Sequence, residues 1–200
     1  MIRKDLLTLI HSLLEDELVI CNLGSPSQEL YSVQDRPENF YMLGSMGMVS
    51  SMALGLSLFT QATVIAIDGD GSVLMNPGSL ITIAHRNPPN LKWIVIDNGS
   101  YGSTGNQPTY TRELTSLAKM AKAAGIKDSI VLTEEDDIPS LLKEKIRSKG
   151  LCFIVIKIAP GNLSPGPIPY DPLFIRNRFM KVVWENTRKG SESIGQSKKS

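Results

Sequence analysis

Two apolar runs that each end in a polar, glycine-containing turn place the strongest constraint on the fold of this chain. One is VIAIDGDGS, which starts at Val64, and the other is WIVIDNGS, which starts at Trp93. Short apolar runs bounded by turn residues are typical of buried parallel strands. The carboxyl ends of neighbouring parallel strands meet at one edge of a sheet, so we expect Asp70 and Asn98 to lie close together there.

The rest of the chain alternates between helical and strand-like patterns. We expect helices over about 6–14, 28–33, 48–59, 76–86, 113–124, 136–149 and 173–184, and strands over 18–21, 40–43, 64–67, 91–96, 130–132 and 151–158. Strands and helices that alternate through short connections predict an α/β fold. Its sheet should be doubly wound and mostly parallel, with helices on both faces.

Length and local composition predict a single folded domain over 1–185. A Pro/Gly-rich arm, APGNLSPGPIPYDP, begins at residue 159 and belongs to that domain. The last stretch, 186–200, is polar and poor in apolar residues, so we expect it to be disordered.

Composition excludes several classes of protein. The 21 basic and 20 acidic residues leave a net charge of +1, which provides no field for capturing nucleic acid. Cys21 and Cys152 each lie inside an apolar run, which favours buried free thiols and a reducing, cytoplasmic setting. The uncharged stretch 39–67 is long enough to cross a bilayer, but serines and threonines interrupt it and it leads into DGDG. We therefore expect a buried helix and strand there.

The residues at the two strand ends suit a magnesium diphosphate. The Asp70 carboxylate, the Asn98 amide oxygen and a nearby backbone carbonyl are hard oxygen ligands of the kind that Mg²⁺ prefers. Gly69 and Gly71 allow the backbone to approach a ligand closely, and the amides of Gly71 and Ser72 can donate to phosphate oxygens. The alternative is that these residues serve only as ordinary turn and capping residues.

At this point the sequence resembles a known family. GDG followed by DN after about thirty residues is similar to the cofactor motif of thiamine-diphosphate enzymes, which usually reads GDG and NN. Asp97 stands where that family has asparagine. The resemblance covers roughly 18–185 and implies magnesium ligation by the side chains of Asp70 and Asn98 and by the backbone carbonyl of Ser100. The cofactor contacts that it implies here are Gly69, Asp70, Gly71, Ser72, Asn98, Ser100, Tyr101 and Gly102.

Two upstream segments extend the resemblance. MLGSMGMVSS is similar to the family segment that holds the aminopyrimidine ring, where Met46 would be the apolar wedge beneath the cofactor and Gly44 and Ser45 its neighbours in the pocket. NLGSPS is similar to the first strand-to-helix turn of the family, from which Gly24 and Ser25 would reach the diphosphate. Met46 has an alternative interpretation as an ordinary core residue.

The same resemblance implies a missing partner. In the family the cofactor lies between this domain and a pyrimidine-binding domain whose glutamate activates it, and 200 residues leave no room for that second domain. We therefore expect an alpha subunit that carries the pyrimidine-binding domain, and a hetero-oligomer with at least two copies of each chain. No catalytic residue is expected from this chain itself.

SYGSTGNQPTYT and PYDPLFIRNRFMKVV resemble the beta subunits of sulfopyruvate decarboxylases, which are close to phosphonopyruvate decarboxylases. The resemblance implies decarboxylation of 3-sulfopyruvate, a small anionic 2-oxoacid, to sulfoacetaldehyde in coenzyme M biosynthesis or sulfonate metabolism. Thr104 and Gln107 are then candidate donors to the sulfonate from a loop that closes over the site. The alternatives are a phosphonopyruvate decarboxylase, an acetolactate-synthase-like subunit, and a non-catalytic phosphate-binding interaction module on the same fold.

Overall fold

A single parallel sheet organises the molecule. The computed structural model describes residues 1–161, 163 and 165–197, with side chains described up to residue 188. Its main sheet has six parallel strands in the order β2-β1-β3-β4-β8-β7. They are β1 (Leu18–Cys21), β2 (Asn39–Tyr41), β3 (Val64–Gly69), β4 (Leu91–Asp97), β7 (Ser129–Leu132) and β8 (Cys152–Lys157). This arrangement confirms the predicted fold class.

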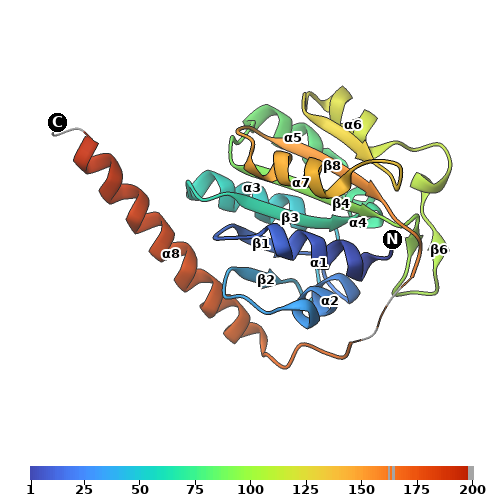
Figure 1. Ribbon diagram of the computed structural model, residues 1–200, viewed down its shortest axis with the longest axis horizontal. Helices are drawn as coiled ribbons and strands as arrows, with labels where there is room; N and C mark the ends of the chain where they lie inside the picture. Colours follow the sequence, from blue (N-terminus) through green and yellow to red (C-terminus); the bar gives the residue numbers. More distant parts are fainter. Residues whose placement is uncertain (162, 164, 198–200) are drawn as a thin grey trace.

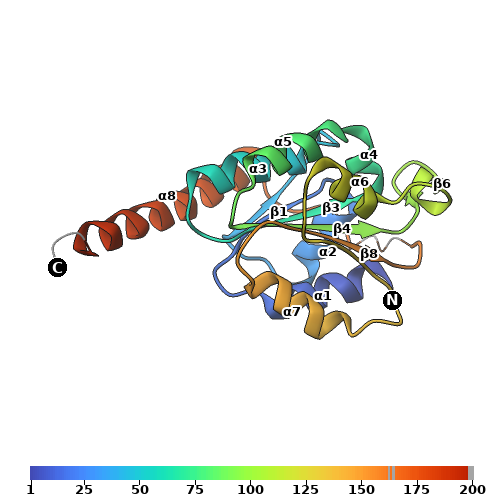
Figure 2. The same ribbon diagram turned by 90° about the horizontal axis from the view of Figure 1, so that it is seen from above.

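Helices cover both faces of the sheet (Figure 2). Trp93 belongs to the apolar cluster on one face and Ile94 to the cluster on the other, because successive residues of a strand point to opposite sides. Buried residues of α3 (Val49–Phe59), α5 (Gly78–Arg86) and α6 (Leu117–Ala124) join the first cluster. Those of α1 (Arg3–Leu13), α2 (Ser25–Val33) and α7 (Ile138–Arg147) join the second. The central strands are therefore buried on both sides, which explains their continuous apolar sequences.

The uncharged stretch 39–67 forms β2, α3 and most of β3, as the sequence predicted. The helix within this stretch, α3, is 11 residues long. Along the chain it follows β2 and precedes β3, and both of these strands pair with β1 in the sheet. Among the residues that the structure describes, no helix is both long enough and apolar enough to cross a membrane.

The C-terminal helix differs from the prediction. α8 (Pro172–Ser197) continues beyond the expected end at Trp184 and projects from the body as the long red helix of Figure 1. The disordered tail expected over 186–200 stays a prediction: α8 runs through 186–197 of it, and 198–200 lie outside the described residues. Phe179 and Val183 bury against the sheet and nucleate the helix.

After β3 and β4, two helices begin later than predicted and short elements precede them. The helix expected from Asn76 begins at Gly78, and the one expected from Glu113 begins at Leu117 behind an Ser116 cap. Three short elements were not predicted: α4 (Asp70–Met75), the 3₁₀ helix η1 (Tyr110–Arg112), and a hairpin of β5 (Ser100–Tyr101) and β6 (Gln107–Pro108). All three lie around the candidate site, where hydrogen bonds between residues far apart in the sequence hold the backbone in place.

Candidate active site

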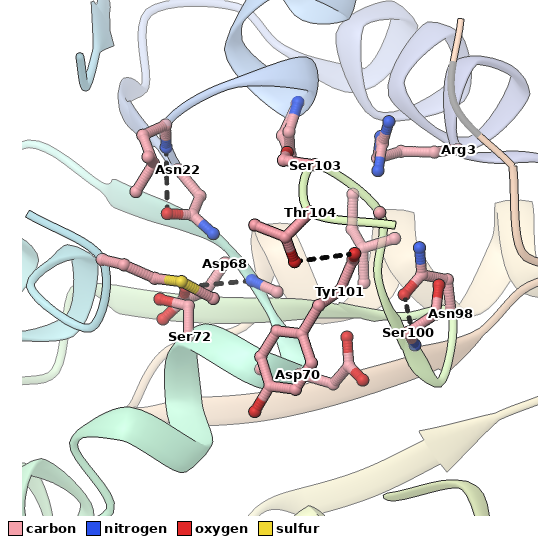
Figure 3. A pocket seen from close by; sticks show the side chains of 17 residues that line it. Arg3, Asn22, Asp68, Asp70, Ser72, Asn98, Ser100, Tyr101, Ser103 and Thr104 are labelled. Atoms are coloured by element: carbon pink, nitrogen blue, oxygen red, sulfur yellow. Dashed lines mark hydrogen bonds between the residues drawn. The ribbon is translucent and has the colours of Figure 1, made fainter. Parts of the chain in front are cut away.

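A cavity of about 210 Å³ opens at the carboxyl ends of β1, β3 and β4 (Figure 3). This is the edge at which open α/β sheets bind ligands. Most of the predicted site residues line it, and they come from three separate segments of chain. They are Met46, Gly69, Asp70, Gly71, Ser72, Asn98, Ser100, Tyr101, Gly102 and Thr104.

Five predicted residues are not part of the cavity wall: Gly24, Ser25, Gly44, Ser45 and Gln107. Gly24 has a φ of +74° and starts the turn into α2, and the next residue but one, Pro26, does line the cavity. The roles of these five residues in binding cofactor or substrate stay predictions.

The sequence interpretation missed several residues of the wall: Arg3, Asn22, Leu23, Pro26 and Ile96. Ser103, which the sequence places in the polar loop expected to close over the site, also lines the cavity. Arg3 is buried and forms an ion pair with buried Glu29, with bonds of 2.9 and 2.7 Å from Nε and Nη2. A lone arginine at the start of an amphipathic helix gives no signal that it will turn inward. Asn22, directly after β1, follows the same strand-end rule as Asp70 and Asn98 and was detectable by it.

Asp70 is buried and held by two threonine hydroxyls from the segment after β6. Thr109 and Thr111 both donate from Oγ1 to its Oδ2, the latter across 3.1 Å. Burial, together with the negative charge of Asp97, raises the pKa of this carboxyl, although the Thr109 hydroxyl opposes the shift. A buried acid in such surroundings is suited to a bound cation.

Asp97, the residue that departs from the usual motif, is also buried and is fully partnered. Its Oδ1 accepts from Thr111 Oγ1 at 2.8 Å and from the backbone amide of Gly99 at 3.1 Å. Its Oδ2 pairs with Lys157 Nζ at 2.6 Å. The extra negative charge therefore has a counter-ion within the chain.

Asn98 and Ser100 form a tight polar turn at the end of β4. The backbone amide of Ser100 donates to Asn98 Oδ1 at 3.0 Å, which aims both residues at the cavity. The Ser100 hydroxyl is buried without a hydrogen-bond partner among the described residues. An unpaired buried hydroxyl is costly, so its position favours a ligand that completes it.

Asp68 lies on the cavity floor two residues before Asp70. Burial raises its pKa to about 6, even though Ser72 and the Gly69 amide favour the charged form. Its Oδ1 accepts from the Gly69 amide at 2.9 Å, and its Oδ2 has no partner within the described chain. Asp68 is thus a buried acid in the cavity wall, directly before the GDG turn in the sequence.

The loop that carries Met46 is hydrogen-bonded to Ser72 of α4 and to Asn76, the residue directly after this helix. The Gly47 amide donates to Ser72 Oγ at 3.1 Å, and Asn76 Nδ2 donates to the Gly47 carbonyl at 3.0 Å. Ser45 takes a left-handed φ of +63°, which is uncommon for a residue with a side chain. These bonds place half-buried Met46 in the cavity wall, as the sequence predicted.

Gly71 lies directly beneath the ring of Tyr101. A Cβ atom added to Gly71 would be 2.3 Å from Tyr101 Cε1, closer than real contacts allow. Glycine is therefore required here by close approach. The ring and the GDG turn form one packed unit.

The tip of the β5–β6 hairpin is exposed and bonded to itself. Thr104 Oγ1 donates to Gln107 Oε1 at 2.9 Å, and Gln107 Nε2 donates to the Thr104 carbonyl at the same distance. Asn106 and Gly105 both have a positive φ, so the turn is tight. The tip is preformed and presents neutral polar groups at the mouth of the cavity.

Comparisons with known proteins agree with this geometry. The family model for the C-terminal TPP binding domain of thiamine pyrophosphate enzymes matches residues 23–156. Benzoylformate decarboxylase from Polynucleobacter necessarius has the same fold, with a TM-score of 0.64 and 18% identity over 80% of this chain and 33% of that one.

Relatives of similar length and longer ones both match. "Sulfopyruvate decarboxylase subunit beta" of Methanocaldococcus jannaschii is 44% identical over 84% of this chain and 89% of its own length. "Sulfopyruvate decarboxylase" of Methanosarcina acetivorans is 42% identical over 92% of this chain but only 47% of its own. "Phosphonopyruvate decarboxylase" of Streptomyces viridochromogenes is 36% identical over 88% of this chain and 44% of its own.

The match extends over nearly the full length of a named beta subunit, and the cavity brings together the motif residues of the wider family. The chain therefore belongs to the thiamine pyrophosphate enzymes, as a C-terminal TPP-binding domain, and within them to the family of sulfopyruvate decarboxylase beta subunits.

Proposed function

We propose that this chain is the beta subunit of a two-chain, thiamine-diphosphate-dependent decarboxylase that converts 3-sulfopyruvate and a proton to sulfoacetaldehyde and CO₂. The observation that carries the proposal is the 44% identity over 89% of a named sulfopyruvate decarboxylase beta subunit. The retained polar cavity supports it, because a scaffold without chemistry needs neither the buried Asp70 nor the unpaired Ser100 hydroxyl.

The residues present fit a magnesium diphosphate. Both threonine hydroxyls on Asp70 use Oδ2, so we assign Oδ1 to Mg²⁺, together with the Asn98 amide oxygen and the Ser100 carbonyl. The unpaired Ser100 hydroxyl and the amides of Gly71 and Ser72 are placed to bind phosphate oxygens. Among the described residues no three His, Cys, Asp or Glu side chains converge, so Mg²⁺ would depend on this mixed set of ligands and on the diphosphate.

When bound, thiamine diphosphate would supply a carbon nucleophile for a keto group and an electron sink for the bonding pair left behind when CO₂ is lost. The residues of this chain bind the cofactor and orient it. Met46 supports the cofactor from the loop tied to Ser72, with Gly44 and Ser45 beside it. Gly24 and Ser25 add donors at the start of α2. Tyr101, packed on Gly71, closes one side of the cavity.

A partner subunit completes the site. The cavity of about 210 Å³ is smaller than the roughly 300–1,000 Å³ of ordinary ligand pockets. Leu43, Met48 and Met75 remain exposed around the loop that carries Met46, a surface suited to a second chain. The longer Methanosarcina acetivorans relative, of which this chain covers 47%, has room for both parts. We assign the activating glutamate to the pyrimidine-binding domain of an alpha subunit, in an assembly with at least two copies of each chain.

The two thiols indicate the cellular setting. Cys21 and Cys152 are both free and buried, which suits a reducing cytoplasm.

The proposed substrate carries a carboxylate and a sulfonate. The uncharged donors of Thr104 and Gln107 lie at the mouth of the cavity, where we place the sulfonate.

Co-expression with the alpha subunit tests the function. The purified complex, supplied with thiamine diphosphate and Mg²⁺, should release CO₂ and sulfoacetaldehyde from 3-sulfopyruvate, and this chain alone should release none. Phosphonopyruvate, the substrate named for the 36% identical relative, is the competing substrate. A higher kcat/KM for phosphonopyruvate would overturn the substrate assignment, and a complex that binds no thiamine diphosphate would favour a non-catalytic module.

A further inference from the structure

Four residues around Asp70 form a hydrogen-bonded network that the proposed chemistry does not yet explain. Thr109 and Thr111 contact each other at 2.8 Å between their Oγ1 atoms, and both donate to Asp70. Thr111 also donates to Asp97, which pairs with Lys157. The network joins the segment after β6 to the ends of β3, β4 and β8.

The sheet register builds the ion pair into the fold. Asp97 and Lys157 are directly registered partners on the neighbouring parallel strands β4 and β8. The Asp97 side chain is only 2% exposed, whereas that of Lys157 is 41% exposed and reaches in from the edge. Lys157 Nζ also donates to the Thr111 carbonyl at 3.1 Å, so it fixes both the carboxylate and the backbone that carries the hydroxyl.

Counting protons shows why the network points to a cation. Two hydroxyl protons are shared among two carboxylates and a contact between the hydroxyls themselves. With Thr109 donating to Asp70, the single proton of Thr111 can serve only one of Asp70 and Asp97 at a time. Lys157 compensates Asp97, and no described Lys or Arg pairs with Asp70 in the same way. Asp70 is thus the uncompensated acid of the network.

We propose that Thr111, Asp97 and Lys157 are positioning residues that hold the Asp70 carboxylate in its metal-binding orientation. Lys157 neutralises Asp97 and holds the Thr111 carbonyl, which fixes the Thr111 hydroxyl between the two carboxylates. Because Asp97 has Lys157 as its counter-ion, the Thr111 proton is free to join that of Thr109 at Oδ2 of Asp70. Oδ1 is left for the divalent cation. This inference rests on the proposed function only in assigning the cation site to Asp70.

Counting bound Mn²⁺ by electron paramagnetic resonance tests the network without relying on turnover. The complex with the alpha subunit is loaded with thiamine diphosphate, and Mn²⁺ stands in for Mg²⁺. Thr111→Val should weaken Mn²⁺ binding about 10-fold, within the 10–100-fold range typical for partners of metal ligands. Thr111→Ser keeps the hydroxyl and should stay within about twofold of wild type.

A matched control separates the network from general effects of losing a threonine. Thr133 also donates its hydroxyl to a carboxylate, that of Asp136 at 3.0 Å, but in an exposed loop away from the cavity. Thr133→Val should leave Mn²⁺ affinity unchanged. Equal affinity in Thr111→Val and wild type would overturn the positioning role, even if the melting temperature of Thr111→Val fell.

A charge-balanced pair of variants tests the other end of the network and remains informative if Thr111→Val does not fold. Lys157→Met should weaken Mn²⁺ binding, because it leaves Asp97 buried without its counter-ion. Asp97→Asn combined with Lys157→Met removes both charges and keeps an acceptor for Thr111, so most of the affinity should return. No recovery in the double variant would overturn the proposal. If the wild-type complex itself binds thiamine diphosphate without Mn²⁺, the proposed metal site fails instead.

Discussion

Asp70 and Asp97, at the ends of β3 and β4, are buried and bonded to residues from other elements, whereas Thr104 and Gln107, at the tip of the β5–β6 hairpin, are exposed and bond each other. Both regions border the same cavity. The difference separates two tasks. The sheet edge holds buried groups in fixed positions for the proposed cofactor, and the exposed tip presents neutral polar groups that we propose recognise the substrate.

The largest effect is expected at the strand ends. Asp70→Asn should lower the activity of the complex by more than the roughly 100-fold that losing an outer partner can cost, because a magnesium ligand is lost. The chain itself should unfold at the same temperature or slightly higher, since a buried charge near Asp97 has been removed. Activity assays and thermal melts of the same preparation measure both. A large loss of stability together with activity would mean that Asp70 is mainly structural.

Gly71→Ala should produce the next effect. The added Cβ would lie 2.3 Å from Tyr101 Cε1, so the ring must move away from the turn. We expect thiamine diphosphate affinity to fall about 10-fold, measured by isothermal titration of the complex, because the donors of the turn lose their packing. Gly78→Ala is the matched control, since a Cβ there meets nothing within 4 Å. Similar losses in both variants would show that the close approach has no special role.

A smaller and different effect is expected at the hairpin tip. Gln107→Ala removes a side chain that bonds Thr104 and faces solvent, so KM for 3-sulfopyruvate should rise several-fold, by about 1 kcal/mol of binding. Thiamine diphosphate affinity should not change. Steady-state kinetics and cofactor titration separate the two. Unchanged KM and kcat would remove the tip from substrate recognition.

The smallest effect tests whether the strand-end region is closed to solvent. Cys21 ends β1 next to the cavity residue Asn22, and burial raises the pKa of its thiol to about 12. Burial likewise raises the pKa of the Cys152 thiol to about 11. Both thiols should be protonated at pH 8 and resist iodoacetamide in the folded protein, as counted by mass spectrometry. Rapid labelling of Cys21 at that pH would show that the floor of the site opens readily.

The same contrast explains what the sequence could predict. The fold and the placement of Asp70 and Asn98 in one cavity were predictable, because buried parallel strands have continuous apolar sequences and their carboxyl ends meet at one edge of the sheet. Met46 was found from its resemblance to the family, since periodicity alone does not separate a cavity wall from a core.

The rest depends on contacts that no local pattern encodes. Arg3 lines the cavity and forms an ion pair with Glu29, 26 residues away, and Thr111 contacts Asp70 across 41 residues. The 3₁₀ helix η1, which carries Thr111, is too short to show a period. The end of α8 at Ser197, beyond the expected end at Trp184, had no signal in the polar composition of this stretch.

The most direct test of the whole account is native mass spectrometry of the protein purified gently from its own source. We expect a hetero-oligomer of this chain with a second chain of comparable size, carrying thiamine diphosphate and Mg²⁺. A homo-oligomer without cofactor, in a preparation where Asp70 and Asn98 are intact, would contradict it.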